Sequence, residues 1–81
     1  MRKKILAAIY TLVKDYNDSP FSVQLIADET KLQEETVNEV FRELKNEGLI
    51  KRKYIWTGVY RVTDEGLFAA EKAFTVSEDF I

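Results

Sequence analysis

The side chains that most often catalyse reactions or hold metal ions are missing from this sequence. Its 81 residues include no histidine and no cysteine, so the usual general base, the thiolate nucleophile and the commonest metal ligands are absent. There is also no glycine-rich phosphate-binding loop. We therefore expect no enzyme activity, no metal and no cofactor, and function is expected from charged side chains that contact another macromolecule.

Charge is segregated along the chain, although the net charge is only −2. Residues 28–47 carry seven acidic and three basic side chains, whereas residues 48–63 carry four basic and no acidic side chains. Lys51, Lys53 and Arg61 belong to the basic block and suit two roles. They can contact DNA phosphates, or they can keep the edge of a sheet charged and so prevent aggregation.

Three helices are predicted before the basic block. Apolar residues at helical spacing predict a first helix from Ile5 to about Tyr16, which the turn-forming run NDSP ends. Ser22 is a good N-cap for a short second helix. The apolar inner face of this second helix is expected to consist of Val23, Leu25, Ile26 and Ala27. The turn TKLQ, which contains no glycine, then leads into the third helix.

The third helix is predicted from Glu34 to Glu47, and Gly48 supplies the left-handed residue that commonly ends a helix. Phe41 is expected at the centre of the core. The buried stripe, at helical spacing, consists of Val37, Val40, Phe41 and Leu44. One exposed flank consists of Asn38, Arg42 and Lys45. A separate column of like charge consists of Glu35, Glu39, Glu43 and Glu47.

A two-stranded hairpin follows, with IKRKYI and VYRV as its strands. A three-residue loop at 56–58 pairs Lys53 with Arg61 and puts Gly58 at the left-handed last position of the loop. This register is preferred to a two-residue turn at 57–58, because it separates apolar from charged side chains. The apolar face then holds Ile50, Tyr54, Tyr60 and Val62, together with the charged Arg52.

Thr63 is expected to cap a last helix, whose first turn holds Asp64 and Glu65, where the helix dipole favours acids. The tail after this helix, TVSEDFI, is short. Residues 1–81 are expected to form a single domain that is mainly α with a small antiparallel β hairpin. No apolar run approaches the roughly 18 residues of a membrane span, so a cytoplasmic protein is the natural interpretation.

The order helix, helix, turn, helix, hairpin, helix is that of a winged helix-turn-helix. The stretch SVQLIADETKLQEETVNEVFRELKNEGLIKR resembles the pattern of this fold, in which a capping serine, an L-A pair, a T-V pair and GLI recur at these spacings. YRVTDEG resembles the wing exit of MarR-like and PadR-like regulators. The sequence departs from the pattern at Lys31, where a glycine is frequent, and at Gln33, where a Ser or Thr cap is usual.

The resemblance implies a small regulator of transcription that binds double-stranded DNA, with the third helix in the major groove and the wing on the backbone. Asn38 and Arg42 are then expected to read base edges. The residues expected to contact phosphates are Ser22, Lys45, Lys51, Lys53 and Arg61. The resemblance also suggests a homodimer, because two half-sites are commonly bound by two copies.

A second interpretation stays open, in which the winged helix contacts a protein rather than DNA. The acidic face of the third helix would then meet a basic partner through Glu35, Glu39, Glu43 and the loop residue Trp56. Glutamates at 35 and 39 face the expected DNA groove, where they can accept from cytosine N4 but more often repel phosphates. The glutamate column is equally compatible with an ordinary solvated helix face. The tail, with Phe74, Val76, Phe80 and Ile81, can form a dimer contact or fold back onto the first helix.

Overall fold

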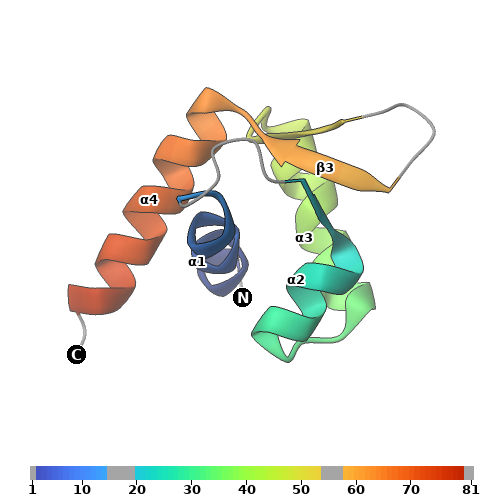
Figure 1. The fold of residues 1–81 in the computed structure, drawn as a ribbon, viewed down its shortest axis with the longest axis horizontal. Helices are drawn as coiled ribbons and strands as arrows, with labels where there is room; N and C mark the ends of the chain where they lie inside the picture. The colour runs from blue at the N-terminus through green and yellow to red at the C-terminus, as the bar shows by residue number, and fades with distance from the viewer. Residues whose placement is uncertain (1, 15–19, 54–57, 80–81) are drawn as a thin grey trace.

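The computed structural model describes residues 2–14, 20–53 and 58–79 of the chain. In chain order, the elements are α1 (Arg2–Val13), β1 (Phe21–Ser22), α2 (Val23–Thr30), α3 (Glu34–Asn46), β2 (Ile50–Arg52), β3 (Val59–Val62) and α4 (Asp64–Asp79). α1 lies between α4 on one side and α2 with α3 on the other, and the β2–β3 hairpin extends on the side of α2 and α3 (Figure 1). This arrangement confirms the predicted fold class, a helical core with a wing and a C-terminal helix.

The turn between α2 and α3 is built without glycine. Ser22 caps α2 as predicted, because its Oγ accepts a hydrogen bond from the N–H of Leu25 at 3.2 Å. Lys31 ends α2 in the left-handed conformation, with φ 63°, which is the conformation that glycine adopts most easily. Gln33 precedes α3 without a side-chain hydrogen bond to cap it. The two departures from the usual pattern thus leave a lysine in a backbone conformation that favours glycine, and leave the start of α3 without a side-chain cap.

The inner face of α2 differs from the prediction at one position. Leu25 is 37% exposed, so its assignment to the inner face is wrong. Ile26, Ala27 and Thr30 are buried and Val23 is half-buried, which is the i, i+3, i+4, i+7 spacing of one helix face and leaves Leu25 outside it. Thr30 can take an inner position because its hydroxyl donates a hydrogen bond to the carbonyl oxygen of Ile26 at 2.7 Å.

Phe41 is fully enclosed in the core, as predicted. Its side chain is 1% exposed, and its ring makes edge-to-face contacts with Phe21 and Tyr60 at centroid distances of 5.6 and 5.2 Å. Phe21 belongs to β1, a short strand that was not predicted and that pairs with β3, so the sheet has the strand order β1-β3-β2. A sequence signal for Phe21 existed: it precedes the N-cap Ser22 and shares the core with Ile26, which are the positions of a hydrophobic staple.

The register of the hairpin differs from the prediction by two residues. The N–H of Lys53 donates to the carbonyl oxygen of Val59 at 2.9 Å, so Lys53 does not pair with Arg61. The predicted pairs of Tyr54 and Ile55, and most of the predicted loop at 56–58, lie outside the described residues. The observed pairs are Ile50–Val62, Lys51–Arg61 and Arg52–Tyr60. Because a shift by an even number of residues keeps every side chain on its face, the predicted separation of apolar and charged faces still holds. Two registers that differ by two residues give the same apolar and charged faces, so this criterion could not identify the correct one.

Thr63 joins the start of α4 to the turn that follows α3. Its Oγ1 accepts the N–H of Gly66 at 3.0 Å, which confirms the predicted N-cap. The same hydroxyl lies 2.7 Å from the carbonyl oxygen of Gly48 and 3.0 Å from that of Leu49, so it can donate to either. Gly48 has φ 76° and ends α3 as expected. α4 continues to Asp79, so most of the predicted tail is helical.

The far part of α4 packs back onto α1. The ring centroids of Phe74 and Tyr10 are 5.0 Å apart, and Nζ of Lys14 lies 5.6 Å from the centroid of Phe74. Of the two alternatives for the tail, Phe74 therefore follows the one in which it folds onto the first helix. α1 itself ends at Val13, earlier than predicted. Tyr16, Phe80 and Ile81 lie outside the described residues.

Candidate nucleic-acid interface

α3 turns a polar face to solvent. Its predicted apolar stripe is buried, and that stripe consists of Val37, Val40, Phe41 and Leu44. Asn38, Arg42 and Lys45 are exposed and follow one another at i, i+4 and i+7, so they form a row along one flank. Lys45 lies in the last turn, where the helix dipole favours a cation. The amide of Asn38 and the guanidinium of Arg42 can each form two hydrogen bonds to one partner, and the ammonium group of Lys45 adds a positive charge.

An open hollow of about 440 Å³ lies where the N-terminal ends of α2 and α3 meet. Its lining consists of Val23, Glu34, Glu35 and Asn38. The hollow thus brings the amide of Asn38 into the same concave surface as the carboxylate of Glu35, beside a half-buried apolar side chain.

Ser22 is fixed both to α2 and to the sheet. Its oxygen accepts from the backbone of α2, which leaves the hydroxyl proton available for donation to a ligand. The N-terminus of α2 also carries the positive end of a helix dipole. As a member of β1, Ser22 pairs with Val59 of β3, so the sheet holds this helix start beside the wing.

The wing places two cations opposite each other. Lys51 of β2 and Arg61 of β3 are register partners, and Lys53 follows on the same face of the hairpin. The side chains of Lys51 and Lys53 are exposed, whereas Arg61 is half-buried. Trp56, the loop residue of the alternative interpretation, lies outside the described residues.

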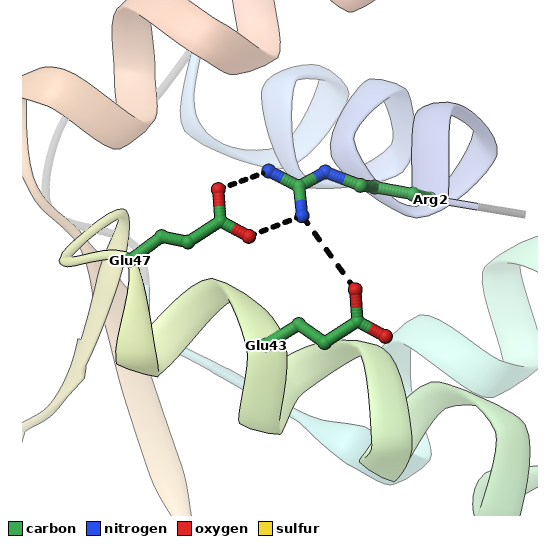
Figure 2. A network of polar contacts seen from close by, with 3 residues as sticks. All are labelled: Arg2, Glu43 and Glu47. Carbon is green, nitrogen blue, oxygen red and sulfur yellow. Dashed lines mark hydrogen bonds and ion pairs between the residues drawn. The ribbon is translucent and has the colours of Figure 1, made fainter.

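The predicted glutamate column divides into two parts. At the C-terminal end of α3, the carboxylate of Glu47 accepts two hydrogen bonds from the guanidinium of Arg2, at 2.5 and 2.6 Å, and Glu43 lies 3.7 Å from the same guanidinium (Figure 2). Glu35 and Glu39 are exposed nearer the N-terminal end. An i, i+4 column rotates by about 40° at each step, which turns Glu47 toward α1 and Glu35 toward the flank of Asn38. The four carboxylates therefore do not form one acidic surface.

The contact with Arg2 changes the acidity of Glu47. The hydrogen bond from the Arg2 side chain, with a smaller contribution from its positive charge, holds the pKa of Glu47 below its ordinary value of 4.5. The same hydrogen bond raises the pKa of Arg2. The raised pKa of Arg2 and the lowered pKa of Glu47 both favour the charged forms of the two side chains. Solvent screens this ion pair, because the side chains are 38% and 48% exposed.

Two kinds of site are not found in the described part of the chain. No group of three or more metal-ligating side chains comes together among residues 2–14, 20–53 and 58–79. Within the same ranges, no helix is both long enough and apolar enough to cross a membrane.

The order and packing of the helices and strands define the class of protein, a winged helix-turn-helix domain. Residues 3–67 match the model of the Crp-like helix-turn-helix domain, and the chain belongs to this family. The predicted winged helix-turn-helix is thereby confirmed. No curated protein matches the sequence significantly.

Among solved structures, the chain is similar to the MarR family transcriptional regulator SPO1453 from Silicibacter pomeroyi DSS-3. The TM-score is 0.73 at 16% sequence identity, and the similarity covers 98% of this chain and 56% of that protein. At this identity the likeness concerns the fold. The chain spans little more than half the length of that regulator.

Proposed function

We propose that this chain binds double-stranded DNA and regulates transcription, with α3 in the major groove and the β2–β3 hairpin on the phosphate backbone. The observation that carries the proposal is the row of Asn38, Arg42 and Lys45 on the solvent side of α3, together with the cationic face of the wing. α2, α3 and the hairpin occupy one side of the molecule, away from α4 (Figure 1). A single duplex can therefore approach all three elements.

Base recognition is assigned to Asn38 and Arg42. An asparagine can make two hydrogen bonds to adenine, and an arginine can make two to guanine, in the major groove. The two residues are one helical turn apart, so they would reach neighbouring base pairs. Because Glu35 shares the hollow with Asn38, it lies where it can accept from the N4 amino group of cytosine.

Phosphate contacts are assigned to Ser22, Lys45, Lys51, Lys53 and Arg61. The register of the wing supports this role for two of the five residues. Lys51 and Arg61 lie opposite each other on the two strands, which brings two positive charges together on one face of the hairpin. Cations gathered on one face of a hairpin suit contact with the phosphates of a duplex.

The second candidate is a protein-binding role for the acidic residues of α3. Its support is the exposure of Glu35 and Glu39, which carry negative charge close to the proposed DNA face. Glu43 contributes less to such a surface than the sequence suggests, because Arg2 lies within 3.7 Å of its carboxylate. The ridge available to a basic partner is thus centred on Glu35 and Glu39.

The wing contact is tested by removing one charge. Lys51→Gln should weaken binding to every duplex and lower the dependence of log Kd on log salt by about 1, because one fewer counterion is released. Lys4→Gln is the matched control: it makes the same change in net charge on the exposed side of α1. Equal effects of the two substitutions on affinity and salt dependence would show that only net charge matters and would refute the wing contact.

The groove contact is tested by sequence preference. Arg42→Ala should cost roughly 1 to 3 kcal/mol on the preferred sequence and relax selection at one base pair. The preferred sequence can be found by selection from a random duplex library with the wild-type chain. If Arg42→Ala weakens binding to all library members equally, Arg42 contacts the backbone and the major-groove assignment is wrong.

A further inference from the structure

The open hollow between the starts of α2 and α3 combines an apolar side chain with carboxylates. Val23, the first residue of α2, is half-buried. Glu34 and Glu35, the first two residues of α3, are exposed. All three line the same volume of about 440 Å³, together with Asn38. A group that enters the hollow therefore meets carboxylate oxygens, which only accept hydrogen bonds, close to apolar carbon atoms.

Backbone contacts fix both helix starts that form the hollow. Ser22, which precedes Val23, accepts the N–H of Leu25 through its Oγ and belongs to β1 of the sheet. In α3, the N–H of Val37 donates to the carbonyl oxygen of Gln33 at 3.1 Å, which closes the first turn of the helix. The lining side chains thus project from backbone that is already ordered, so a ligand binds here with little further ordering of the chain.

The four bases of a duplex differ in how their major-groove edges suit this lining. Guanine presents two acceptors, and adenine presents the acceptor N7 beside its N6 amino group. Thymine presents the acceptor O4 beside its methyl group. Cytosine presents the donor N4, and the next atom along its ring edge, C5, is an apolar carbon. Cytosine is therefore the base whose edge offers both a donor for a carboxylate and an apolar neighbour for Val23.

The charge of Glu35 also favours a base with an amino group. An unpaired carboxylate beside DNA repels the phosphates, so a glutamate in the groove lowers affinity unless it accepts a hydrogen bond from a base. Glu35 lies one helical turn before Asn38, on the flank of α3 that the proposed function assigns to base recognition. A donor on the base edge is thus the partner that suits Glu35.

We propose, on the basis of the DNA binding proposed above, that this hollow recognises 5-methylcytosine. Glu35 accepts a hydrogen bond from N4, and Val23 contacts the methyl group on C5. The methyl group is bonded to the ring atom next to the one that carries N4, so a single base can make both contacts. Transfer of one methyl group from water to an apolar contact corresponds to roughly a fourfold gain in affinity. Val23 is thereby assigned a role in specificity, and a modified base is the preferred ligand.

Four versions of one duplex test the proposal with the wild-type chain alone. The preferred duplex is first selected from a random library, and each cytosine in turn is then replaced by 5-methylcytosine, thymine or uracil, with the complementary base opposite. Fluorescence anisotropy at constant salt should show a position at which 5-methylcytosine binds about fourfold more tightly than cytosine. At the same position, thymine and uracil, which carry O4 in place of N4, should bind at least about fivefold more weakly than cytosine.

Two substitutions separate the contact with the amino group from the contact with the methyl group. Glu35→Gln should make the affinities for cytosine and thymine similar, because an amide can accept from N4 and donate to O4, and should retain the preference for the methyl group. Val23→Ala should remove the methyl preference and retain the preference for cytosine over thymine. The matched controls are Glu29→Gln and Leu25→Ala, at exposed positions of α2 outside the hollow, and both should preserve the two preferences. Each preference compares duplexes bound by the same protein, so a change in the overall stability of a variant cancels.

The outcomes distinguish this inference from the proposed function. Absence of binding to every duplex at low salt would contradict DNA binding itself, and with it this inference. Binding that is equally tight for cytosine and 5-methylcytosine at every position would overturn the inference and leave DNA binding intact. A methyl preference that disappears in Leu25→Ala as well as in Val23→Ala would also overturn it, because the methyl group would then not be recognised in the hollow.

Discussion

The guanidinium of Arg2 and the carboxylate of Glu47 form a two-point contact, with N–O distances of 2.5 and 2.6 Å, between the first turn of α1 and the residue after α3. This contact ties the end of the proposed recognition helix to the start of the chain. It also withdraws Glu47, and in part Glu43, from the acidic surface that the sequence suggests.

The Arg2–Glu47 pair predicts a loss of stability in acid. The folded pKa of Glu47 lies below its ordinary value of 4.5, so the unfolded chain takes up this proton first as the pH falls. The stabilisation is therefore present in full above pH 4.5 and is lost as the pH falls through the lower folded pKa. Urea unfolding from pH 7 to pH 3 should show a shallower decrease in Arg2→Gln than in the wild type. Identical pH profiles would show that the contact contributes nothing to stability in solution.

Phe41 is predicted to be the most costly side chain to truncate. It is 1% exposed and meets the rings of both Phe21 and Tyr60, so Phe41→Ala leaves a cavity and should cost roughly 3 to 5 kcal/mol. The control is Phe68→Ala, which removes the same atoms from a surface position and should change the free energy of unfolding by less than about 0.5 kcal/mol at concentrations where the chain is monomeric. Chemical denaturation measures both. Similar costs at the two positions would contradict the assignment of Phe41 to the core.

The two helix ends with positive φ predict effects of opposite sign. Lys31 has φ 63°, a conformation that costs a side chain roughly 1 to 2 kcal/mol and that glycine adopts freely. Lys31→Gly should therefore stabilise the fold by up to about 1 kcal/mol, after the added entropy of the unfolded chain is subtracted. Gly48→Ala should instead destabilise it by about 1 kcal/mol, because φ is 76° while a Cβ would meet nothing within 4 Å. Thermal melts that move in the same direction for both variants would show that the backbone account is wrong.

The helical part of the fold was predictable from the sequence because it rests on local rules. The stripe from Val37 to Leu44 repeats at the helical period, and Ser22, Gly48 and Thr63 are residues with strong preferences for helix ends. Each of these features needs only its near neighbours along the chain. The helix-turn-helix and the start of α4 therefore follow directly from them.

The remaining features depend on contacts between distant parts of the chain. β1 is too short to show a period, and Phe21 is recognisable as a strand residue only once β3 is beside it. The hairpin register was wrong because its charged and apolar faces are the same in two registers of equal parity. Arg2 and Glu47 are 45 positions apart, and no spacing rule connects a surface cation with one particular surface acid.

The glutamates of α3 provide a prediction that separates the two candidate functions. In the DNA account, replacing Glu35 and Glu39 together with glutamine should strengthen binding to non-specific duplex, because two negative charges near the phosphates are removed. If Glu35 reads a cytosine, the same change should also weaken selection at that base pair. Anisotropy titrations with random and selected duplexes measure both effects. Asp64→Asn and Glu71→Gln together, at exposed positions of α4, provide a control with the same change in net charge away from the proposed interface. Unchanged binding to both duplexes would place these glutamates outside the interface.

The central claim is that this winged helix binds duplex DNA through α3 and the wing, and the most direct test is the salt dependence of wild-type affinity. Fluorescence anisotropy with a random duplex, from about 50 to 200 mM salt, should give log Kd rising linearly with log salt. Contacts from Lys45, Lys51, Lys53 and Arg61 predict a slope of about 3 to 4, at roughly 0.9 for each neutralised phosphate. Absence of detectable binding at the lowest salt would contradict the claim and would leave the surface around Glu35 and Glu39 as the leading candidate site.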